Sequence, residues 1–105
     1  MPYSSEAKAT GVVGGSITVE GIRAGENHSV ATEATGITGT APVSARAIGS
    51  TVFEPVLLSD GTTQLSVDFA DIRTFGIENR GINAIEYDTS GLAGAGDITI
   101  TVQTG

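Results

Sequence analysis

The 105-residue sequence contains no cysteine and no tryptophan, and aromatic residues make up only 5% of it. The lack of cysteine excludes disulfide bonds and thiolate metal sites. No apolar run is long enough to cross a bilayer as a helix. Residues 1–15 contain no basic segment followed by an apolar stretch, so we expect no secretory signal and synthesis in a cytosol. With so few rings available, the core has to consist mainly of valine, isoleucine, leucine and alanine.

Charge is also scarce, and most of it has one sign. Charged residues account for 16% of the chain and the formal net charge is −7. An acidic surface repels phosphate backbones and anionic lipid headgroups, so we expect neither direct nucleic-acid binding nor membrane binding. Globular proteins usually carry about a quarter charged residues. A surface this poor in charge favours burial against another chain, and the sequence therefore predicts a homo-oligomer or docking to a partner.

The sequence is rich in glycine, with 15 residues, and in aliphatic residues that alternate with threonine and serine. This alternation is clearest at residues 16–20 and 97–103, and it is typical of half-buried strands. The apolar run of residues 51–58 contains Pro55, which predicts an edge strand or a bulge. Helix signals are absent throughout, so these patterns predict β structure.

Two turn motifs lie between strand-like segments. Asp60-Gly61 and Asn79-Arg80-Gly81 each predict a β-hairpin, because glycine adopts the positive φ of a tight turn at little cost. Seven or eight short strands without a helix predict an all-β fold, an antiparallel β-sandwich or a jelly-roll-like arrangement, with a small barrel as the competitor. We expect residues 1–13 to form a flexible N-terminal arm and residues 14–105 a single β-sandwich domain.

His28 is the one histidine, and it follows Glu26 and Asn27 in a segment that resembles a turn. It could act as a general base or a metal ligand, but we expect an exposed turn residue. A lone histidine without cysteine cannot form a usual structural zinc site. The sequon Asn27-His28-Ser29 needs a secretory route that the sequence does not indicate.

Paired carboxylates could serve a glycosidase, but strand alternation predicts that the acidic residues mostly face outward as solubilising charges. A sugar-cleaving groove also needs aromatic platforms, and Tyr3, Tyr87 and three phenylalanines are too few and too dispersed. We therefore expect no catalytic residue. The carboxylates considered are Glu20, Glu54, Asp68, Asp71, Glu78 and Glu86.

Three further motifs do not meet the requirements of a ligand site. Gly94-Ala95-Gly96 precedes a strand rather than a helix and has no lysine after it, and Gly14-Gly15 fails in the same way. Asp60-Gly61 lacks the ligand spacing of a calcium loop, which leaves only weak surface binding open. No cofactor and no metal site is expected.

Four arginines are dispersed along the chain and form no cluster. They could pair with carboxylates of a neighbouring subunit, or form surface salt bridges worth about 0–1 kcal/mol each. These residues are Arg23, Arg46, Arg73 and Arg80.

Three successive segments, Ala47–Thr51, Val67–Ile72 and Phe75–Ile85, together resemble small β-sandwich virion proteins of tailed bacteriophages. The resemblance covers about the C-terminal half and carries no functional residue over to this chain. It implies a head decoration, or cement, protein that binds the outer capsid surface. The partners would be copies of itself, as in a trimer, and the major capsid or another virion protein.

In that role the arm, Met1–Val13, would add a strand to a neighbour. A tail or connector component is the first alternative. A free-standing module that binds carbohydrate or a host surface is the second.

Overall fold

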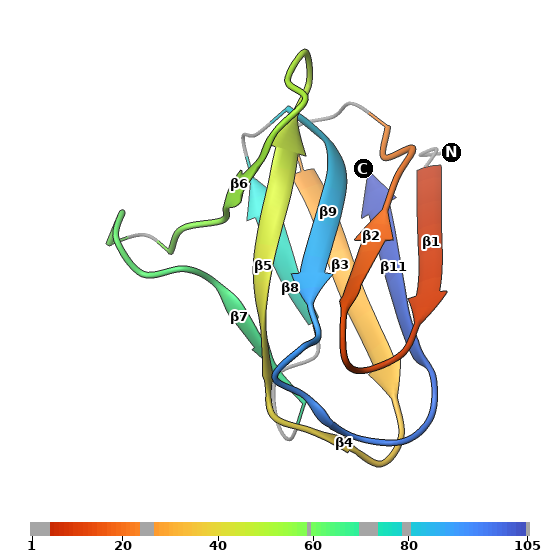
Figure 1. Cartoon of the computed structure of the whole chain (residues 1–105). Helices are drawn as coiled ribbons and strands as arrows, with labels where there is room; N and C mark the ends of the chain where they lie inside the picture. The colour runs from red at the N-terminus through yellow and green to blue at the C-terminus, as the bar shows by residue number, and fades with distance from the viewer. Residues whose placement is uncertain (1–4, 24–26, 59, 70–73, 79–80, 105) are drawn as a thin grey trace.

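The computed structural model describes residues 5–23, 27–58, 60–69, 74–78 and 81–104, and these residues form strands and turns without a helix (Figure 1). The predicted all-β fold class is confirmed. Among the same residues there is therefore no helix long and apolar enough to span a membrane. The described part contains eleven strands rather than seven or eight, because four of them are only two or three residues long. The strands are β1 (Ser5–Gly11), β2 (Ser16–Val19), β3 (Asn27–Ala34), β4 (Ile37–Thr38), β5 (Thr40–Ala47), β6 (Phe53–Pro55), β7 (Ser66–Asp68), β8 (Thr74–Glu78), β9 (Ile82–Asp88), β10 (Ala93–Gly94) and β11 (Ile98–Thr104).

Two antiparallel sheets lie face to face. The first has the order β1-β11-β3-β8. The second has the order β2-β9-β5-β6, and β7 also pairs with β5. A short ribbon of β4 and β10 closes one end of the sandwich (Figure 1). Apart from β5 and β6, the neighbours in each sheet are not consecutive along the chain, so the two halves of the chain are interleaved.

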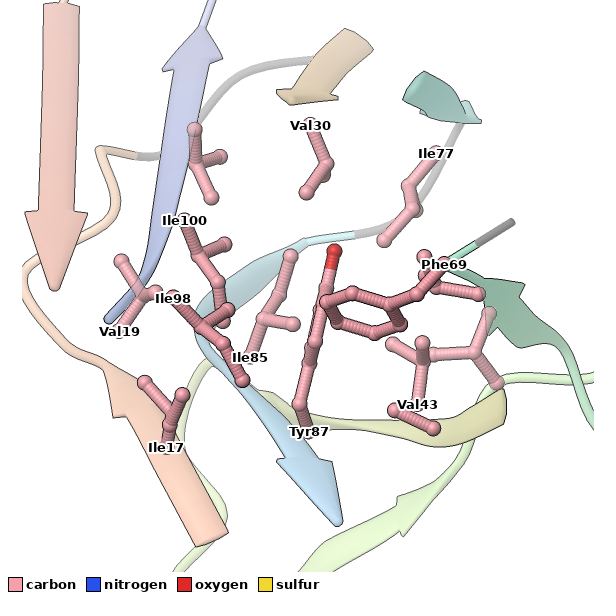
Figure 2. Packing of buried hydrophobic residues seen from close by; sticks show 14 of the residues in the cluster. Ile17, Val19, Val30, Val43, Phe69, Ile77, Ile85, Tyr87, Ile98 and Ile100 are labelled. Carbon is pink, nitrogen blue, oxygen red and sulfur yellow. The ribbon is translucent and has the colours of Figure 1, made fainter. Parts of the chain in front are cut away.

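The core lies between the sheets and follows the two-residue period of the strands. In β11, Ile98, Ile100 and Val102 are at most 1% exposed. Ile98 and Ile100 lie close to Ile85 and Tyr87 of β9 (Figure 2). Full burial of one such side chain stabilises the fold by roughly 1.5–3 kcal/mol relative to exposure. The sheets are therefore held together mainly by aliphatic contacts around a single buried tyrosine.

One hydrogen bond joins the two sheets inside this core. The hydroxyl oxygens of Tyr87 in β9 and Thr32 in β3 lie 2.7 Å apart. A buried hydroxyl without a partner costs about 1–3 kcal/mol, so each group satisfies the other. Burial raises the pKa of Tyr87 to about 12, and the bond to Thr32 opposes part of that rise.

The N-terminal segment differs from the expected flexible arm over residues 1–13. Ser5–Gly11 form β1, which pairs with β11 along its whole length, from Ser5 opposite Thr104 to Gly11 opposite Ile98. Ala7 and Ala9 pack against the core from this edge. Alanine is so weakly apolar that its alternation with Glu6 and Lys8 gives little strand signal in the sequence.

The hairpin predicted at Asn79-Arg80-Gly81 is wrong. β8 pairs with β3 in one sheet, whereas β9 pairs with β2 and β5 in the other, so the connection crosses between the sheets. Residues 79–80 lie outside the described part, and Gly81 is not among the positive-φ glycines. Two alternating strands look the same in sequence whether they share a sheet or face each other across the core.

The hairpin predicted at Asp60-Gly61 is confirmed. The chain leaves β5 after Val56 and returns to it at Leu65, and both residues bind Val43 of β5. The carbonyl oxygen of Val43 accepts a hydrogen bond from Val56 N at 3.1 Å, and its N–H donates one to Leu65 O at 2.9 Å. β6 and β7 are thus two halves of one edge strand, and the described residues 57–58 and 60–64 belong to a hairpin inserted between them. Leu57 pairs with Gln64 at its base, and Gly61 has a φ of 75° at its tip.

Gly94 in β10 lies where the β4–β10 ribbon is tightest. A Cβ added there would overlap the carbonyl oxygen of Gly36, and the φ of Gly94 is 123°. Any side chain would collide with backbone, so this contact requires glycine.

We predict a graded response to glycine substitution. Gly94→Ala should destabilise the protein by about 3 kcal/mol or more, because a clash with backbone adds to the unfavourable φ. Gly61→Ala should cost about 1 kcal/mol, since only its φ is unfavourable. Gly15→Ala is the matched control, with open space around it and no positive φ. Urea denaturation measures all three, and equal midpoints for the three variants would contradict the close approach of the backbone at Gly94.

Candidate interaction surfaces

His28 is a core residue, and the prediction of an exposed turn position is wrong. Its side chain is 2% exposed because β3 begins at Asn27 and alternation turns His28 inward. Its Nε2 lies 3.1 Å from the carbonyl oxygen of Arg23, which also accepts a hydrogen bond from Thr104 Oγ1. This arrangement fixes the backbone at Arg23 against the start of β3 and the end of β11. Among the described residues no group of three or more histidine or acidic side chains is placed to hold a metal ion.

The carboxylates named from the sequence are dispersed over the molecule. On the outer face of the second sheet, Glu86 accepts a hydrogen bond from Thr18 Oγ1 at 3.3 Å, and Glu20 contacts Arg46. Glu54 lines a hollow of about 250 Å³, and no other described carboxylate lines that hollow. Asp68 is half-buried in β7, whereas Asp71 and the side chain of Glu78 lie outside the described part. Among the described carboxylates named from the sequence, none shares a hollow with another, whereas Glu33 and Asp97, which were not named, both line a hollow of about 310 Å³.

Arg46 links strands on the outer face of the second sheet. Its Nε donates to Asn83 Oδ1 at 2.9 Å, and its Nη2 donates to Glu20 Oε1 at 2.5 Å. The guanidinium carbon also lies 5.3 Å from the centre of the Phe53 ring. Of the two roles expected for the arginines, Arg46 takes the intramolecular one. Arg73 and Arg80 fall outside the described residues.

The aromatic residues offer no stacking platform in the part of the chain that is described. Tyr87 and Phe69 are fully buried, and Phe75 of β8 is partly buried against the core, with its ring centre 6.4 Å from that of Tyr87. Phe53 is half-buried beneath Arg46, and Tyr3 lies outside the described range. Recognition of a sugar by ring stacking therefore has no support from these residues.

The glycine motifs take structural positions. Gly94 belongs to β10, and Gly96 precedes β11 rather than a helix. Gly14 and Gly15 lie in the turn between β1 and β2, where Gly14 N donates to Thr89 O at 3.0 Å. None of them opens a helix, so a phosphate-binding loop is not formed.

Aspartates at two turns act as backbone caps. Asp60 Oδ1 accepts hydrogen bonds from the N–H groups of Thr62 and Thr63, each at 2.9 Å, and Oδ2 accepts one from Thr63 Oγ1. The hydrogen bonds from Thr63 are the main reason that the pKa of Asp60 is lowered to about 2. Asp88 caps Ser90 in the same way, which lowers its pKa. Asp60 thus fixes the turn of the inserted hairpin.

Apolar side chains are displayed on two projections from the second sheet. Ile48 and Val52 are 54% and 61% exposed in the turn between β5 and β6. Leu57 and Leu58 are 36% and 44% exposed on the inserted hairpin. Figure 1 shows both segments projecting away from the two sheets. Projecting segments with exposed apolar side chains are suited to contact with another protein.

Comparison with known proteins identifies the fold only. The sequence matches no protein-family model and no curated protein. The structure of the SPBc2 prophage-derived protein YomS superposes with a TM-score of 0.60 at 10% identity, over 98% of this chain and 95% of that one. A structure described as Bacillus endospore appendages forming disulfide-linked pili superposes with a TM-score of 0.50 at 11% identity, over 97% and 86%. Both share this β fold over nearly the whole chain.

The Asp60 cap predicts a pH dependence of stability. The folded-state pKa of about 2 lies below the ordinary value of 3.8, so the cap stabilises the fold fully above that value. Its contribution is lost as pH falls from about 4 towards about 2. Asp60→Asn should remove this part of the pH profile, measured as the urea midpoint at a series of pH values. A variant whose profile parallels the parent would show that the cap does not form.

Proposed function

We propose that this protein is a non-enzymatic structural component of a bacteriophage particle, and more narrowly a capsid decoration protein. It would bind the outer capsid surface through repeated contacts with copies of itself and with the major capsid protein. Symmetry would multiply contacts that are individually modest.

One observation carries the proposal. Several described ionisable side chains stabilise the fold through their contacts: Asp60 caps a turn, Arg46 ties strands together and His28 is buried. The large apolar side chains that are exposed among the described residues are, by contrast, Ile48, Val52, Leu57 and Leu58 on the two projections and Val12 in the turn between β1 and β2. A protein built in this way offers contact area rather than a reactive centre.

The fold matches support the proposal at a coarser level. One neighbour is a prophage-derived protein and the other is described as part of a pilus, and both align over nearly all of this chain. The neighbour's pili are disulfide-linked by their description, whereas this sequence has no cysteine. Assembly of this chain would therefore depend on non-covalent contacts.

The test is co-sedimentation with capsid shells and, separately, with tails of the phage whose genome carries the gene. We expect the protein to pellet with capsids. Val52→Asp and Leu58→Asp should weaken capsid binding by about tenfold or more, because each places a charge in an apolar contact. Ser29→Asp, on the exposed outer face of β3, is the matched control and should bind as the parent does.

Other outcomes separate the alternatives. Binding to tails alone would assign the protein to the tail or connector. Binding to neither particle, together with retention on a polysaccharide column, would replace the structural role with that of a carbohydrate-binding module.

A further inference from the structure

The edges of the two sheets differ in how well they are protected from pairing. In the second sheet, β2 has four residues, and the opposite edge is split into β6 and β7 by the inserted hairpin. In the first sheet, β8 has five residues. β1 is the longest edge strand at seven residues, and its register with β11 runs without a bulge. Exposed edges of this kind are templates for pairing with another strand.

Among the described strands, β11 is the only one paired with β1, and the burial of β1 agrees with an uncovered outer edge. Ala7 and Ala9 face the core in register with Val102 and Ile100 of β11, which are at most 1% exposed. The two alanines themselves are only partly buried. A further strand alongside β1 would cover them.

The outward side chains of β1 decide which strand fits there. Glu6 and Lys8 project from the same face, and their charged groups lie 3.9 Å apart with both side chains about half exposed. A partner strand that places a positive charge opposite Glu6 and a negative charge opposite Lys8 would form an ion pair with each. The same segment of a second copy, running antiparallel, has this arrangement of charges.

Symmetry and hydrogen bonding leave few registers to consider. In an antiparallel pair, two directly opposed residues either both point their N–H and C=O groups at each other or both point them away. The two-fold axis of a strand that pairs with its own copy therefore passes between a residue and the same residue of the other copy. Centring on Glu6 opposes two glutamates, and centring on Lys8 opposes two lysines. Centring on Ala9 pairs Lys8 with Thr10. Centring on Ala7 places each Glu6 opposite the Lys8 of the other copy, twice.

We propose that two copies of this chain associate edge to edge through β1, antiparallel and with the two-fold axis at Ala7. The first sheets of both copies then form one continuous sheet, closed by two Glu6–Lys8 pairs. This inference rests on the proposed function in that it names the self-contact of the assembly. It can nevertheless hold or fail independently of capsid binding.

Charge variants test the register. Glu6→Lys and Lys8→Glu should each weaken self-association by about tenfold or more, because each opposes like charges across the axis. The double variant Glu6→Lys/Lys8→Glu should regain it, and an equimolar mixture of the two single variants should form a heterodimer. Glu33→Lys, an exposed change on β3 with the same effect on net charge as Glu6→Lys, is the control and should leave association unchanged. Sedimentation velocity and native mass spectrometry provide the measurement.

A cysteine pair tests the axis directly, in a chain that otherwise has no cysteine. With the axis at Ala7, the Cα atoms of the two copies of that residue lie roughly 4.5–5.5 Å apart, within disulfide range. The two copies of Ala9 would lie roughly 14 Å apart, because each is displaced along its strand. Ala7→Cys should therefore give a covalent dimer under mild oxidation, while Ala9→Cys should remain monomeric on a non-reducing gel.

Defined outcomes would overturn the inference. They are a parent protein that is monomeric at millimolar concentration, single charge variants that associate as the parent does, or equal cross-linking of the two cysteine variants. If the dimer forms but neither capsids nor tails bind it, the β1 contact stands and the virion role fails. If capsids bind the protein as a monomer, the virion role stands and the β1 contact fails.

Discussion

The structure depends on a single constraint, the burial of two pleated apolar faces against each other. A strand presents alternate residues to opposite sides, so each inward position of β11 and β9 must be apolar or carry a satisfied polar group. Tyr87 meets this requirement through Thr32 of the facing sheet. His28 meets it in part through the carbonyl of Arg23. Side chains committed to this core are unavailable for chemistry at the surface.

The same constraint determines where the remaining polar residues lie. Outward positions and turns take them, and there they mostly stabilise local structure: Asp60 and Asp88 cap turns, and Arg46 ties neighbouring strands together. What is left for function is the boundary of the sandwich, namely its edge strands and the segments that project from them. The proposed role based on contact surface would use these edges and projections.

Sequence reasoning succeeded where a local rule decides the structure. The strict alternation of β11 and the Asp60-Gly61 turn depend on neighbouring residues only, and both were predictable. It failed where a distant partner decides. Residues 5–11 look like an arm until β11 lies beside them, and His28 looks exposed until the register of β3 turns it inward. The crossing between β8 and β9 is equally invisible, because alternation specifies a buried face but does not specify which sheet contains it.

The inserted hairpin and β1 have opposite effects on strand pairing at a sheet edge, since the hairpin prevents it and β1 permits it. Residues 57–64 interrupt the edge beside β5, where Val43 binds both Val56 and Leu65, so no long strand can add there. The lysine on β1 would by itself discourage pairing. Glu6 two residues away removes that protection for one register only, because Lys8 then meets an opposite charge. Selectivity for a second copy thus needs no disulfide bond and no aromatic residue, and this acidic chain has no cysteine and few aromatics.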